Sequence, residues 1–167
     1  MAPLYAKLQQ LIAAWQAKDI DRVLGFMHDD IVWHYAAAAM PPVRGKATAA
    51  KLLHRFQADM HQITWRIFAH AETDDRLFVE GVDDYRTAEG LRVAAPYAGV
   101  LDFKDGLIIG WRDYVDIGVI AAQKAGEPLS AQAGAVAARA RATRTTGRFS
   151  ERGPLTSPLR TARRSTA

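Results

Sequence analysis

Two aspartates are notable because each interrupts an otherwise apolar stripe. Alternate residues of a strand share one face of its sheet. On this pattern Asp83 and Asp113 are the charged members of two stripes, whose other members are Leu77, Val79, Gly81 and Tyr85 in one segment and Ile109, Trp111, Val115 and Ile117 in the other. Both carboxyls are therefore expected on the buried side of a sheet, where a charge is costly unless it is paired or hydrogen-bonded.

Two buried carboxyls are suited to acid–base chemistry. Burial raises the pKa of a carboxyl, and mutual repulsion separates the two pKa values, so that one group is protonated and the other ionised near neutral pH. We therefore interpret Asp113 and Asp83 as candidate catalytic residues. The alternative is structural, with either carboxylate accepting hydrogen bonds from Trp, Tyr or Arg side chains.

Aromatic residues supply candidate walls for a pocket. Trp33 and Tyr35 share one face of a short predicted strand, either as core residues or as an apolar wall with two polar groups, and His34 points the other way. The histidines lack metal-ligand spacing, and nucleotide, phosphate and serine-hydrolase motifs are absent from the sequence, so we predict no metal and no cofactor. A small apolar substrate is predicted by the apolar wall formed by Trp33, Trp65, Trp111 and Leu77.

Periodic patterns along the chain indicate the elements that would position these residues. Apolar residues at helical spacing predict helices over 4–15, from the N-cap Asp19 to 27, and over 45–60, with a short strand at 31–35 and a Pro-rich loop between the last two. From residue 63 the period changes to two, which predicts strands at 63–68, 77–87, 91–103 and 107–117, then a helix at 119–124. This order predicts an α+β fold, in which a curved antiparallel sheet is wrapped by three N-terminal helices around a conical hollow.

Charge divides the chain into two parts. The net charge is +4, but residues 130–167 hold eight arginines and one acid, a local charge of +7, so residues 1–129 carry −3. We expect one domain at 1–129 and a disordered Arg-rich tail at 130–167, because the tail has too few apolar residues to offset its ordering entropy. The domain's charge does not favour nucleic acid or a membrane surface, although a basic arm for acidic partners is an alternative for the tail. Without cysteines, a signal sequence or a membrane span, the expected location is cytoplasmic.

The segment 110–116, GWRDYVD, resembles the closing strand of limonene epoxide hydrolases and their SnoaL-like relatives. Residues 80–83, EGVD, are similar to the Glu-Arg-Val-Asp strand of that family, and residues 40–45, MPPVRG, to its Pro-rich loop before the third helix. The resemblance covers roughly residues 4–127. It implies the cone-shaped fold of the nuclear transport factor 2-like superfamily, and it allows for a homodimer through the outer face of the sheet.

The resemblance also implies roles for individual residues. In the epoxide hydrolases one Asp activates water, a second protonates the epoxide oxygen and an Arg links them, while a Tyr and an Asn hold the water. By position the water-activating residue is Asp113 and the acid is Asp83, but the arginine position holds Gly81, which we expect to enlarge the cavity. The water-holding positions fall on Trp33 and Tyr35, or on Tyr35 and Ala37, and neither count finds an Asn.

Three functions are compatible with this pattern. The first is an epoxide hydrolase in which His34, Arg86 or Arg92 replaces the arginine. The second is a ketosteroid isomerase-like or cyclase-like enzyme, with Asp113 as base and Asp83 or Tyr35 as hydrogen-bond donor to an oxyanion. The third is a non-catalytic module that binds an apolar ligand.

Overall fold

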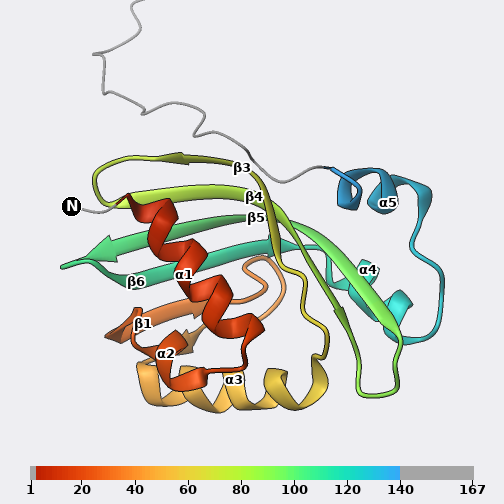
Figure 1. The fold of residues 1–167 in the computed structure, drawn as a ribbon, viewed down its shortest axis with the longest axis horizontal. Coiled ribbons are helices and arrows are strands. Elements are labelled where there is room, and N and C mark those ends of the chain that lie inside the picture. Colours follow the sequence, from red (N-terminus) through yellow and green to blue (C-terminus); the bar gives the residue numbers. More distant parts are fainter. Residues whose placement is uncertain (1–2, 140–167) are drawn as a thin grey trace, which may run out of the picture.

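One mixed six-stranded sheet organises the protein. The computed structural model describes residues 3–139, and its strands lie in the order β2-β1-β6-β5-β4-β3. An antiparallel meander is formed by β3 (Arg66–Glu72), β4 (Arg76–Arg86), β5 (Arg92–Lys104) and β6 (Leu107–Val115). β1 (Met27–His34) pairs with β6 in parallel, and β2 (Val43–Arg44) pairs antiparallel with β1. The sheet is curved and does not close (Figure 1), which confirms the predicted α+β class.

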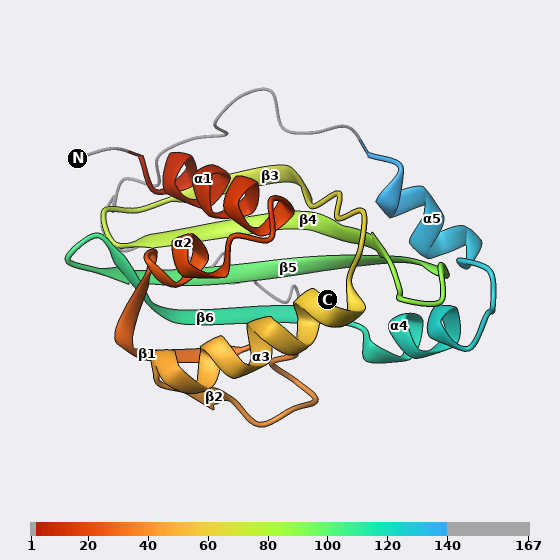
Figure 2. The same cartoon turned by 60° about the horizontal axis from the view of Figure 1, so that its bottom comes forward.

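Three N-terminal helices lie over one face of the sheet (Figure 2). They are α1 (Leu4–Gln16), α2 (Ile20–Leu24) and α3 (Lys46–Asp59), which form in the three predicted segments. α2 ends at Leu24 instead of at residue 27, because Met27 already belongs to β1, which begins four residues before its predicted start. The predicted stripe of α1 is buried, and the carboxylate of Asp19 caps α2 by accepting a 3.0 Å hydrogen bond from the backbone N–H of Arg22. The helices therefore enclose the inner face of the sheet, on which both aspartates were expected.

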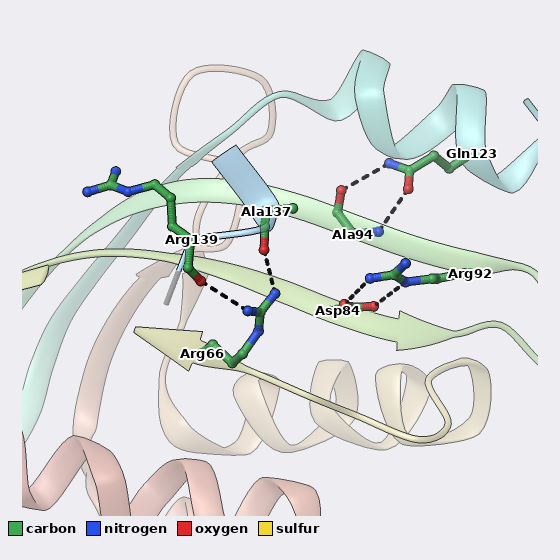
Figure 3. A network of polar contacts seen from close by, with 7 residues as sticks. All are labelled: Arg66, Asp84, Arg92, Ala94, Gln123, Ala137 and Arg139. Atoms are coloured by element: carbon green, nitrogen blue, oxygen red, sulfur yellow. Dashed lines mark hydrogen bonds and ion pairs between the residues drawn. The ribbon is translucent and has the colours of Figure 1, made fainter. Parts of the chain in front are cut away.

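A fourth helix closes one end of this layer. α4 (Ile117–Lys124) follows β6 almost directly. Its buried Gln123 side chain makes the hydrogen bonds to β5 that a neighbouring strand would otherwise make. The Gln123 amide oxygen accepts from the backbone N–H of Ala94 at 2.8 Å, and its amide nitrogen donates to the carbonyl of Ala94 at 3.2 Å (Figure 3). These bonds satisfy backbone groups that β6 is too short to reach, and they fix α4 against the sheet.

The predicted start of the disordered tail, at residue 130, is wrong for residues 130–139. Residues Ala131–Ala137 form α5, in which Ala137 packs on Phe68, Val82 and Ala94. Arg66 donates to the backbone carbonyls of Ala137 at 2.5 Å and Arg139 at 3.1 Å (Figure 3). These apolar contacts and hydrogen bonds offset the ordering entropy of a short helix. Residues 140–167 lie outside the described part of the chain.

Two irregularities shift residues from their expected faces. A register change in the β5–β6 pair leaves Ile109 unpaired, so that Ile108, rather than the expected Ile109, is buried in the core. β3 begins at Arg66 instead of at residue 63, and its pairing with β4 shifts by one residue between Ile67 and Ala69. Both irregularities change side-chain facing in a way that a strict period of two does not predict.

Candidate active site

A cavity of about 810 Å³ lies between the sheet and the helices. This volume is within the range of small-molecule sites. Asp83 on β4 and Asp113 on β6 both line it, as do four predicted wall residues, Trp33, Tyr35, Trp65 and Trp111. The predicted facing of the two carboxyls is therefore confirmed, and the segments that carry them are separated by β5.

The environment of Asp113 includes N–H donors. The indole Nε1 of Trp111, two residues earlier on the same face, donates to Asp113 Oδ1 at 2.8 Å. Burial raises the pKa of Asp113 to about 7; the indoles of Trp111 and Trp33 lower it, and the carboxyl of Asp83 raises it. The buried Nε1 of Trp33 lowers the pKa of Asp113 although it lacks a well-aligned hydrogen bond to any residue in 3–139. Donors that face Asp113 favour its ionised form.

Asp83 lacks comparable support. Its Oδ1 is buried and has no hydrogen-bond partner within residues 3–139. Burial raises the pKa of Asp83 to about 7, and the negative charge of Asp84 raises it further. Within residues 3–139 no donor to Asp83 is found, whereas indole N–H groups face Asp113, so the ionised form is favoured at Asp113 over Asp83.

Stacked indoles form one wall of the cavity. Trp111 stacks between Trp33, at a centroid distance of 5.3 Å, and Trp65, at 5.9 Å. Tyr35 and Phe56 pack edge-on against Trp33 and against each other. The wall is largely apolar, so the electrostatic interactions of the two carboxyls are stronger than they would be in water.

Gly81 is buried and does not line the cavity, so it does not enlarge it, contrary to expectation. A Cβ built at position 81 would overlap the backbone carbonyl oxygen of Arg66, and would lie 3.2 Å from both the Ile67 Cδ1 and the Tyr97 ring. The register shift of β3 lies beside Gly81, and a strand glycine commonly marks such an irregularity or a close approach of another backbone. The backbone therefore excludes any side chain here, and Tyr97, which the sequence analysis did not identify, fills the space.

The three proposed substitutes for an arginine lie elsewhere. Arg92 forms two hydrogen bonds with the Asp84 carboxylate, and Arg86 donates to the carbonyl of Gly90. Neither of them lines the cavity, nor does His34. Leu77, predicted as a wall residue, is also absent from the lining because it is fully buried in the core.

Three further charged residues line the cavity. Lys124 on α4 pairs with Asp59 at the end of α3, and the exposed side chain of Arg55 lies one turn earlier on α3. Within residues 3–139 no group of three or more His, Asp or Glu residues has a metal-binding arrangement. No helix there is long and apolar enough to cross a membrane. Apart from these three charged residues, the polar side-chain groups of the lining are the two carboxyls and the aromatic N–H and O–H groups.

The sequence profile of the SnoaL-like domain matches residues 8–111, more than half of the chain. The chain belongs to the SnoaL-like domain family. Its matched region contains Asp83, Gly81 and Tyr97 and ends at Trp111, two residues before the second aspartate. Among curated proteins, none matches this SnoaL-like protein significantly.

Solved structures share its fold. An LEH-like epoxide hydrolase from M. tuberculosis is 27% identical, with a TM-score of 0.60 over 70% of this chain and 84% of the other. A Catenulispora acidiphila protein with a ketosteroid isomerase-like fold is 19% identical, with a TM-score of 0.63 over 73% and 93%. A Shewanella putrefaciens protein assigned as a SnoaL-like polyketide cyclase is 14% identical, with a TM-score of 0.67 over 76% and 99%. The solved structures similar to this SnoaL-like protein thus share its fold under different assignments, and the fold alone does not fix the reaction.

Proposed function

We propose that this protein is an acid–base enzyme that adds water to a small apolar epoxide, with Asp113 as the base and Asp83 as the acid. The observation that carries the proposal is the unequal environment of two buried carboxyls in one apolar cavity. Trp111 donates to Asp113, whereas Asp83 has a buried oxygen without a partner in residues 3–139. The 27% identity to an LEH-like epoxide hydrolase supports the same reaction class.

The reaction uses one proton from water and one from the protein. Ionised Asp113 takes a proton from water as the oxygen attacks an epoxide carbon, and the C–O bond of the ring breaks. Protonated Asp83 gives its proton to the oxygen that leaves the carbon, which yields a diol. Asp113 then holds a proton and Asp83 a negative charge, so a proton must return from Asp113 to Asp83 before the next turnover.

No Lys or Arg within residues 3–139 forms an ion pair with Asp83 or Asp113. Neither Gly81 nor the distant Arg86 and Arg92 can neutralise a carboxylate in the cavity. With no arginine to hold both groups ionised, burial keeps the pKa of each near 7. The lost arginine therefore removes an electrostatic clamp but leaves the protonation states that acid and base catalysis require.

The test is turnover of styrene oxide and limonene oxide by the full chain in H₂¹⁸O, with diols analysed by mass spectrometry. We expect one labelled oxygen per diol, and a loss of about 100-fold or more in kcat for Asp113→Asn and for Asp83→Asn. Asp105→Asn makes the same chemical change in the exposed turn after β5 and should preserve turnover. Diol formation that survives Asp113→Asn would refute the assignment of the base.

Proton transfer without water is the second candidate. It is favoured by the apolar lining, together with the unpartnered, buried oxygen of Asp83, which when protonated is a donor for a carbonyl. Asp113 would then remove a proton next to the carbonyl and return it elsewhere on the substrate. Deuterium exchange into cyclic ketones, lost in Asp113→Asn, distinguishes this reaction from hydrolysis. If the folded protein binds apolar ligands but catalyses neither reaction, the cavity is a binding site alone.

A further inference from the structure

Tyr97 occupies a position on β5 between the two aspartates. It pairs with Gly81 of β4 on one side and Val115 of β6 on the other, while Asp83 pairs with Ala95 and Asp113 pairs with Gly99. Ala95, Tyr97 and Gly99 alternate along β5 and so share its inner face. A large aromatic ring is thus flanked by small residues in the row that separates the carboxyls.

Two glycines make room for this ring. The Tyr97 Cε1 lies 3.2 Å from the position that a Cβ would take at Gly81, and its Cε2 lies 3.2 Å from the equivalent position at Gly99. Carbon atoms this close are already tighter than ordinary van der Waals contact. A side chain at either glycine would therefore displace the ring, and the ring occupies the space that an arginine at position 81 would require.

The hydroxyl group of Tyr97 is held from one side. Trp65 Nε1 donates a 2.6 Å hydrogen bond to Tyr97 Oη. Because an indole can only donate, Tyr97 is the acceptor in this bond and its own hydrogen is directed elsewhere. Within residues 3–139, the hydrogen bond found at this hydroxyl is the one from Trp65. Burial and the charges of Asp113 and Asp83 hold the pKa of Tyr97 well above its usual value, so the hydroxyl stays protonated.

We propose that Tyr97 donates this hydrogen to the substrate oxygen that gains negative charge, and that Trp65 is its positioning residue. The role rests on the proposed acid–base function. A bond accepted from Trp65 polarises the phenol and strengthens its donation, and a fixed donor in an apolar cavity stabilises a developing oxyanion. A neutral phenol does this without drawing both carboxyls into the ionised state, as an arginine would.

The first experiment compares Tyr97→Phe with the wild-type chain. Phenylalanine keeps the ring between the two glycines and removes only the hydroxyl. We expect kcat for styrene oxide to fall about 100-fold, with KM and the midpoints of the pH–rate profile nearly unchanged. Trp65→Phe should lower kcat by a smaller factor. Tyr114→Phe, the same change on an exposed residue of β6, should match the wild type.

A wild-type kcat in Tyr97→Phe would overturn the proposal. So would a variant whose loss lies wholly in KM or in thermal stability, because that pattern indicates packing alone. The expected split between kcat and KM therefore separates a donor from a residue that only fills space.

A second measurement needs no turnover. The carbonyl stretch of bound 2-adamantanone, an apolar ketone, is isolated by subtracting the infrared spectrum obtained with the ¹³C-labelled ketone. A hydrogen bond from Tyr97 shifts this band to lower frequency in the wild type and in Tyr114→Phe, and the shift is lost or reduced in Tyr97→Phe. Identical bands in all three proteins would refute the donor role. If epoxides are not hydrolysed but the shift depends on Tyr97, the proposed reaction is wrong and the donor remains.

Discussion

Gly81→Ala tests the claim that the backbone excludes a side chain beside the two carboxyls. The new methyl group would overlap the carbonyl oxygen of Arg66, which belongs to a paired strand and cannot rotate away. Overpacking of this kind costs about 3 kcal/mol at the upper end of its usual range. Replacing a strand glycine returns roughly 0.5–1 kcal/mol of backbone entropy. The net destabilisation is about 2 kcal/mol, which for a chain of this size lowers Tm by about 6 °C.

Thermal unfolding followed by circular dichroism measures this difference. Gly134→Ala is the matched control, because its nearest new contact is Leu129 Cδ2 at 3.8 Å and its position in α5 favours alanine. The control should unfold at the wild-type temperature or slightly above it. Equal Tm values for Gly81→Ala and the wild type would show that β3 yields easily, and the physical reason given for the missing arginine would then be wrong.

Two further predictions concern pH and the packing of α5. The pKa values of Asp83 and Asp113 are raised from 3.8 to about 7, so the folded protein binds more protons than the unfolded chain between these values. Its free energy of unfolding, measured in urea, should fall as pH rises from about 4 through 7, by roughly 1.4 kcal/mol per pH unit for each retained proton. The double variant Asp83→Asn, Asp113→Asn should show a flatter dependence of this free energy on pH. A free energy that rises through this window in the wild type would contradict the raised values. Ala137→Asp should lower Tm, because it buries an unpaired charge against the sheet. Ala138→Asp, at the exposed neighbouring position, should leave Tm unchanged. Equal effects of the two substitutions would show that α5 is not packed as described.

Much of the fold follows from local periodicity. The helices and the long strands form where the spacing of apolar residues changes from helical to alternating, and Asp19 caps α2 as its position predicts. The two-residue β2 is too short to leave a pattern. α5 was missed because its stability depends on contacts with Phe68, Val82 and Ala94, which are distant in sequence, and not on its own composition.

The candidate site was partly predictable for the same reason. Asp83 and Asp113 lie in regularly paired stretches of their strands, so the alternation of faces holds for them and both face the cavity. Ile109 lies at a register change, so its facing was predicted wrongly. Tyr97 left a weak signal, namely an aromatic residue between Ala95 and Gly99 on one face of a predicted strand. Its significance depends on the approach of Arg66 to Gly81, which is a tertiary contact.

Titration of the two carboxyls by ¹³C NMR tests the central claim most directly. The chain is labelled at aspartate, and Asp83→Asn and Asp113→Asn assign the two signals. We predict that Asp113 ionises first and that Asp83 keeps its proton to about pH 7, so that an acid and a base coexist in the cavity near neutral pH. Two signals that are both fully ionised at pH 5 would contradict the account, because no acid would then be left to protonate a substrate oxygen.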